Sequence, residues 1–91
     1  MNGWIYILQS QKNKSFYVGS SSNLERRLAE HNLGKCKYTS KLTPWKMVFS
    51  QKYETLATAR KVELKLKQLK SKIILEKIIE SGECKLVPPM D

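Results

Sequence analysis

Two short stretches, Trp4-Ile-Tyr-Ile-Leu-Gln9 and Phe16-Tyr-Val-Gly19, decide the fold of this chain. The first is rich in aromatic and β-branched residues, which predicts a strand over 4–9 that is buried on both faces. The second predicts another strand over 16–19. The polar, turn-like segment that joins them is short, so the two strands are expected to pair as an antiparallel hairpin.

A helix is expected directly after this hairpin. Ser22-Asn-Leu-Glu25 has the spacing of a capping box, which predicts a helix beginning there. Gly34 is the residue type that ends a helix in the left-handed conformation. Arg27 and His31 are four residues apart within this helix, so their side chains are expected to share one face.

The second half of the chain is expected to add one strand and two helices. Residues 35–45 form a basic loop, and residues 46–52 predict a third strand. Thr55 is expected to cap a long helix, and Ser71 a short one over about 72–80 that Gly82 ends. The long helical stretch carries a stripe of apolar residues with a period typical of a core-facing helix: Ala59, Val62, Leu66, Leu69 and Ile73.

This order, β-β-α-β-α-α, predicts an α+β fold in which helices flank a three-stranded antiparallel sheet. With 91 residues, the chain is long enough for one domain, which we expect over 1–82 with a loose tail over 83–91. No apolar run reaches the ~18 residues of a membrane span, and the start is too short and uncharged for a signal peptide. Cys36 and Cys84 lack a Cys-x-x-Cys spacing, so we expect a reduced, cytoplasmic protein without a membrane partner.

The net charge of +9 indicates a polyanionic partner, most often nucleic acid. Residues 55–75 carry six basic side chains and one acid, Glu63, whereas residues 76–91 carry two basic and four acidic side chains. The tail is therefore not the expected contact. A lone carboxylate in a basic helix has two explanations. It forms a surface ion pair with Lys67 at i+4, or it is a ligand for a cation.

Several motifs of the chain match a known family in order. Trp4-Ile-Tyr6 and Tyr17-Val-Gly19 resemble the two tripeptides of the GIY-YIG nuclease superfamily, which lie on neighbouring strands. The likeness is greatest to a small single-domain bacterial group and extends to the catalytic subunit of a eukaryotic junction-cutting endonuclease. It spans roughly residues 3–75, and the further matching motifs are Arg27-x-x-x-His31, Tyr38-Thr39, Pro44-Trp45 and Ala59-x-x-x-Glu63-x-x-x-Lys67.

Two positions depart from the family pattern. Trp4 replaces the first glycine, as is common in the small group, and leaves Tyr6 in place. Ser20 stands where some family nucleases carry a lysine that helps to activate the tyrosine.

The resemblance implies that the chain hydrolyses DNA phosphodiester bonds with one divalent ion, Mg²⁺ or Mn²⁺. Glu63 would be the metal ligand, which suits a hard cation that keeps several waters. Arg27 would contact the phosphate, and Tyr17 would be the general base on the attacking water. Tyr6 would orient the water or the phosphate, and His31 would hydrogen-bond that water or hold Tyr17.

Nothing in the sequence resembles a base-reading module, so recognition is expected to depend on DNA structure, such as branches or junctions, rather than on sequence. The chain is small for a DNA footprint, which leaves open a homodimer or a partner protein. The alternatives are a non-catalytic nucleic-acid-binding module on the same fold and a protein-interaction domain using the apolar helix at 73–79. The basic residues expected to follow phosphates are Lys35, Lys37, Lys41, Lys46, Arg60 and Lys67.

Overall fold

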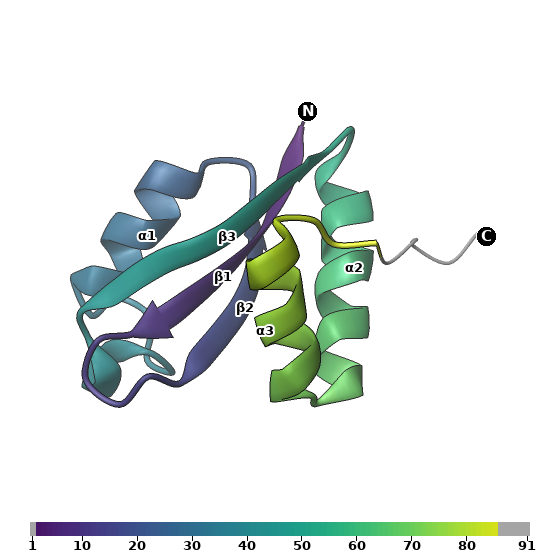
Figure 1. Cartoon of the computed structure of the whole chain (residues 1–91). Coiled ribbons are helices and arrows are strands. Elements are labelled where there is room, and N and C mark those ends of the chain that lie inside the picture. The colour runs from purple at the N-terminus through teal and green to yellow at the C-terminus, as the bar shows by residue number, and fades with distance from the viewer. Residues whose placement is uncertain (1, 86–91) are drawn as a thin grey trace.

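The computed structural model of the chain describes residues 2–85 and has the predicted order of elements (Figure 1). A short 3₁₀ turn at Ser40–Leu42 lies in the loop that precedes the third strand. The α+β prediction is therefore confirmed. The strands and helices are β1 (Gly3–Ser10), β2 (Phe16–Ser21), α1 (Leu24–Asn32), β3 (Trp45–Tyr53), α2 (Leu56–Leu69) and α3 (Lys72–Ser81).

The sheet has the order β2-β1-β3, and both pairs of strands are antiparallel. The predicted hairpin is present, with Tyr6 of β1 opposite Gly19 of β2. The third strand pairs along β1, from Gly3 opposite Tyr53 to Ser10 opposite Trp45. The first strand therefore lies at the centre, and β2 is an edge strand.

Apolar side chains cover both faces of β1, as predicted. On one face, Ile5 and Ile7 pack against α2 and α3. On the other face, Tyr6 and Leu8 pack with Trp45 beside half-buried side chains of α1. Figure 1 shows α1 on one side of the sheet and α2 and α3 on the other. A central strand between two apolar layers needs apolar residues at consecutive positions, which explains why this segment does not alternate.

The helix ends largely follow the predicted caps. The hydroxyl groups of Thr55 and Ser71 accept hydrogen bonds from backbone N–H groups in the first turns of α2 and α3. The capping box at Ser22 is wrong by one residue. Asn23 is the N-cap of α1, because its side-chain oxygen accepts from the N–H of Arg26. Asn23 is held there by Ser21, whose hydroxyl bonds to its backbone N–H and C=O.

The apolar stripe of the long helical stretch is confirmed over its first half and wrong over its second. Ala59, Val62 and Leu66 are buried, whereas Leu69 is 39% and Ile73 65% exposed. The reason is that α2 ends at Leu69 and Lys70 takes the left-handed conformation, with φ +47°. Because the chain turns there, α3 presents a different face to the core, through Ile74, Ile78 and Ile79.

Beyond α3, the chain is described as far as Lys85. Cys84 packs in the core, and its backbone N–H and C=O bond to the side chain of Gln51. The remainder of the predicted tail, 86–91, lies outside the described residues. No helix within residues 2–85 is long and apolar enough to cross a lipid bilayer.

Candidate active site

A chain of buried hydrogen bonds starts at Tyr6 on the central strand. The Tyr6 hydroxyl lies 3.0 Å from Nε2 of His31, and Nδ1 of His31 lies 2.8 Å from Oγ1 of Thr39. The Thr39 hydroxyl in turn donates to the carbonyl of Cys36 at 3.4 Å. Thr39 Oγ1 must therefore accept from Nδ1–H of His31, which leaves Nε2 to accept from the Tyr6 hydroxyl.

Tyr6 has room for its ring because its cross-strand neighbour is a glycine. A Cβ atom at Gly19 would lie 2.3 Å from the Tyr6 hydroxyl oxygen and 2.4 Å from its Cζ. Both distances are shorter than any van der Waals contact, so the side chain of Tyr6 lies directly over the backbone of β2. The second tripeptide thus needs its glycine to accommodate the tyrosine of the first.

His31 is neutral in this arrangement. Its imidazole is fully buried, and burial together with the positive charge of Arg27 lowers the pKa of His31. A protonated imidazole could not accept the hydrogen bond from Tyr6.

A lowered histidine pKa makes stability depend on pH. The unfolded chain binds a proton at this histidine below about pH 6.5, whereas the folded chain resists it, so stability is lost as the pH falls through that range. We expect the melting temperature to fall between pH 7.5 and pH 5.5, and to fall less in His31→Gln, measured by circular dichroism. Equal slopes in the two proteins would contradict this assignment.

Tyr17 stands on the edge strand beside the same histidine. Its ring contacts His31 edge-on, with centroids 4.9 Å apart, and Nζ of Lys67 lies 5.4 Å from the ring centroid. Burial raises the pKa of Tyr17, and the Lys67 charge opposes that rise. Lys67, and to a smaller extent Arg27, are therefore the cations that favour the phenolate, in a chain that has Ser20 where some relatives carry a lysine.

Tyr6 and Tyr17 differ in how readily each would lose a proton. Burial raises the pKa of Tyr6 to about 12, although a hydrogen bond from Arg27 favours its ionised form. The Tyr6 hydroxyl is thus protonated at neutral pH. Arg27 also forms an ion pair with Glu30 at 3.1 Å and is about one-third exposed, so its guanidinium borders both the buried tyrosine and the solvent.

Glu63 lies in the middle of α2, facing β2. Its Oε1 accepts from the Ser20 hydroxyl at 2.5 Å, and its Oε2 accepts from Nζ of Lys67 at 2.5 Å. The Glu63 side chain is 19% exposed. The ion pair with Lys67 is therefore present, and Ser20 fixes the second oxygen. These two contacts hold the carboxylate in one orientation at the border of the solvent.

The donor set of Glu63 fits a divalent ion of the magnesium class. Within residues 2–85 no three His, Cys, Asp or Glu side chains lie close enough to share a metal. Mg²⁺ does not need such a group, because it keeps several waters and takes one or two carboxylates together with substrate phosphates. A single oriented carboxylate beside a serine hydroxyl meets that need.

The structure brings together the side chains predicted to act in catalysis. Tyr6 and Tyr17 both contact His31, Arg27 bonds to Tyr6, and Lys67 links Tyr17 to Glu63. These residues come from both hairpin strands, α1 and α2, so the site lies where the two helical layers meet the edge strand.

The predicted phosphate-binding residues are more scattered. Lys67 lies within the site, and Arg60 is exposed one turn before Glu63 on α2. Lys46 lies on β3, at the edge of the sheet opposite β2, so it is separated from Tyr17 by the whole of β1. The exposed lysines on the loop that also carries Thr39 are Lys35, Lys37 and Lys41.

Sequence reasoning missed three contacts of the site. Ser20 is a hydrogen-bond partner of Glu63, and Thr39 is a partner of His31. Lys67 is a neighbour of the Tyr17 ring, whereas its ion pair with Glu63 is one of the two explanations that the sequence offered for that carboxylate. The i, i+4 spacing of Glu63 and Lys67 was a usable signal. The Ser20 contact joins residues 43 apart in the chain, and no local pattern predicts it.

Comparison with known proteins agrees with these motifs. A family model described as the GIY-YIG catalytic domain matches residues 2–78. A UPF0213 protein of Listeria welshimeri is 38% identical over 88% of this chain and 89% of its own length. One of Enterococcus faecalis is 42% identical over 76% of this chain and 81% of its own.

A solved structure shares the fold. The NMR structure of a UPF0213 protein from Bacillus halodurans is 28% identical and superposes with a TM-score of 0.58. The match covers 93% of this chain and 89% of that one. The names of these relatives describe a family and no reaction.

Proposed function

The chain belongs to the GIY-YIG catalytic-domain family, a family of nucleases, and from this we propose that it is a divalent-metal-dependent DNA endonuclease. The observation that carries the proposal is the position of Glu63. Its carboxylate is oriented at the solvent border within one network with two tyrosines, a histidine and an arginine. Phosphate binding alone does not call for a carboxylate among lysines, because its negative charge repels the phosphate.

In this proposal, Glu63 would hold the metal ion, Mg²⁺ or Mn²⁺, whose charge would neutralise the phosphate and the leaving oxygen. Arg27, at the solvent border, gives the phosphate oxygens a charge-assisted contact. Tyr17 accepts a proton from the attacking water, with Lys67 stabilising the phenolate. Tyr6 stays protonated, donates its hydroxyl hydrogen to His31 and orients the attacking water through its hydroxyl oxygen, and His31 keeps Tyr6 and Tyr17 in place.

Two observations favour the alternative of a binding module without catalysis. Both oxygens of Glu63 are already bonded, and the pKa of Tyr17 is raised rather than lowered. In a binding module these groups would serve stability alone. The two functions differ in whether DNA is cut.

The test is incubation of the purified chain with flapped, branched and single-stranded DNA, with Mg²⁺ or Mn²⁺ and with a chelator. We expect metal-dependent cleavage. Binding of these DNA substrates with cleavage of none of them would support the alternative. Several points stay predictions from the sequence. They are a preference for DNA structure, a role in repair or recombination, a footprint extended by a second copy or a partner protein, and a cytoplasmic location.

If Tyr17 is the base, the reaction should speed up with pH. Less than about 0.1% of a tyrosine with a raised pKa is ionised at pH 7, so the rate should climb about tenfold per pH unit toward pH 9. Tyr17→Phe should be inactive throughout. The measurement is the single-turnover rate against pH, and a flat profile from pH 6 to 9 would count against Tyr17.

Lys67 provides a matched test of the same step. Lys67→Gln removes the nearby positive charge, which raises the pKa of Tyr17 further and should move the rate profile to higher pH. Lys67→Arg keeps a positive charge and should move it less. Identical profiles for the glutamine variant and the parent would show that Lys67 does not act on the base.

A further inference from the structure

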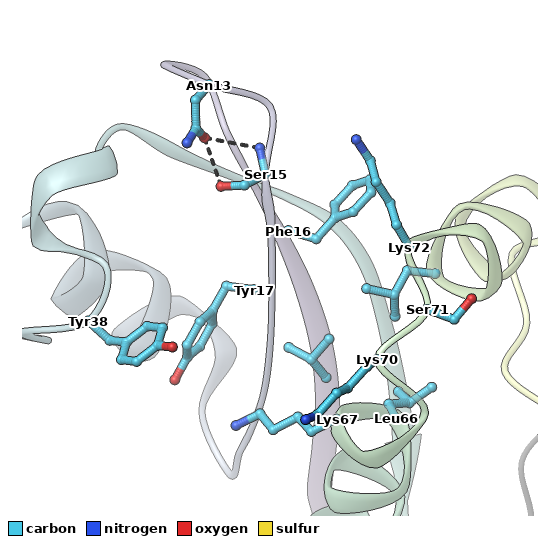
Figure 2. Close-up of a pocket in the computed structure, with 12 residues that line it drawn as sticks. Asn13, Ser15, Phe16, Tyr17, Tyr38, Leu66, Lys67, Lys70, Ser71 and Lys72 are labelled. Carbon is cyan, nitrogen blue, oxygen red and sulfur yellow. Dashed lines mark hydrogen bonds between the residues drawn. The ribbon is translucent and has the colours of Figure 1, made fainter.

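An open groove of about 720 Å³ adjoins the candidate site on the far side of Tyr17 and Lys67. It runs between the edge strand β2 and the turn that joins α2 to α3. Figure 2 shows Tyr17 and Tyr38 on one side of the groove, and Phe16 and Lys72 on the other. Tyr17 and Lys67 belong to both the groove and the site, so whatever lies in the groove leads directly to the proposed base.

Aromatic rings mark the two sides of the groove. Tyr38 is 84% exposed, and its ring lies 6.4 Å from that of Tyr17, tilted by 47°. Phe16 is half-buried on β2, with Nζ of Lys72 5.8 Å from its ring centroid. A tyrosine this exposed contributes little to the core. Planar side chains that remain accessible beside a groove are suited to stacking on flat ligands.

The charge of the groove has one sign. Lys67, Lys70 and Lys72 line it, and none of the described residues that line it carries a carboxylate. Lys72 is the first residue of α3, whose first turn contains no acidic residue. Positive side chains are unfavourable at a helix N-terminus, where the backbone already presents positive partial charge. An anion in the groove would offset this repulsion.

We propose that this groove binds an unpaired DNA strand, with bases stacking on Tyr38 and Phe16 and phosphates near Lys67, Lys70 and Lys72. The proposal deepens the proposed function and rests on DNA being the substrate. A single strand is favoured over a duplex because paired bases are already stacked on one another. Their faces are therefore closed to Tyr38 and Phe16. The groove would thus guide the unpaired arm of a branched substrate to the site.

The test is the anisotropy of a labelled oligo-dT of about 12 nucleotides, a length within the usual range of single-strand sites, and of a duplex of equal length. Both are measured with wild-type protein in a chelator, so that no cleavage occurs. We expect the single strand to bind more tightly than the duplex. Tyr38→Ala, at an exposed position, should weaken single-strand binding about tenfold and duplex binding much less.

A matched pair of double variants separates the groove from overall charge. Lys70→Gln/Lys72→Gln and Lys52→Gln/Lys85→Gln lose the same charge, but Lys52 and Lys85 line other surfaces of the molecule. The first pair should weaken single-strand binding and reduce its salt dependence, and the second should change it far less.

Equal weakening by both double variants, or equal binding of duplex and single strand with no effect of Tyr38→Ala, would overturn the proposal. Because the assay needs neither metal nor cleavage, its outcome is separate from that of the proposed function. A chain that binds single strands through the groove but cuts nothing would keep this inference and lose the endonuclease. A chain that cuts without groove-dependent binding would do the reverse.

Discussion

Glu63→Gln is expected to lower the rate of DNA cleavage by about a thousandfold, since it removes the carboxylate charge that would hold the metal. Such a loss corresponds to about 4 kcal/mol of transition-state stabilisation. Glutamine has nearly the same shape, and its side-chain oxygen can still accept from Ser20 or Lys67. The fold should therefore persist, and a surface ion pair of this kind contributes well under ~1 kcal/mol.

The measurement is single-turnover cleavage with saturating protein, alongside the circular dichroism melting curve. Glu80→Gln is the matched control, because it makes the same chemical change at an exposed position on α3. It should cleave like the parent. A Glu63→Gln variant that melts normally and still cleaves at the parental rate would remove Glu63 from the reaction.

Gly19→Ala is expected to destabilise the sheet and to disturb the candidate site at the same time. The new methyl group would lie 2.3 Å from the Tyr6 hydroxyl oxygen, so either the ring or the strand pairing must move. Overpacking of this kind costs about 1–3 kcal/mol. Because Tyr6 would leave its bond to His31, cleavage should fall together with stability.

Gly82→Ala and Tyr6→Leu are the controls for this prediction. At Gly82 a Cβ meets nothing within 4 Å, so alanine there costs only the left-handed backbone at φ +75°, about 1 kcal/mol. Tyr6→Leu removes the clashing ring atoms. Gly19→Ala should therefore cost clearly less in a Tyr6→Leu background, as measured by urea denaturation. Additive losses would show that the glycine is needed for another reason.

Local sequence patterns were sufficient for the elements of this fold. The unbroken apolar run of β1 predicts a strand that is covered on both faces, and the structure confirms it. The single residues Thr55 and Ser71 predict helix N-caps, and the structure confirms both. The failures are places where two local signals competed. Asparagine and serine are equally good capping residues, so the sequence does not decide between Asn23 and Ser22. The apolar period continues from Leu69 to Ile73, and it gives no sign that Lys70 between them takes the left-handed conformation and ends the helix.

The candidate site was predictable only in part, because some of its contacts depend on the packing of elements that are distant in the sequence. Side chains on one helix face, such as Arg27 and His31, follow from spacing, and the family likeness supplies their partners. The contacts from Ser20 to Glu63 and from His31 to Thr39 depend on how separate elements dock. The pKa of Tyr17 depends on the same docking, through the burial of its ring and the distance to Lys67.

The bond between Ser20 and Glu63 also determines when the candidate site is completed during synthesis of the chain. A nascent chain that has released β1, β2 and α1 already carries both tyrosines, Arg27 and His31. It lacks Glu63, the proposed metal ligand, until α2 has left the ribosome and folded back over a separation of 43 residues. If the chain is the proposed endonuclease, a chain that ends before α2 would therefore lack the proposed metal ligand, and the capacity to cut would be acquired late in synthesis.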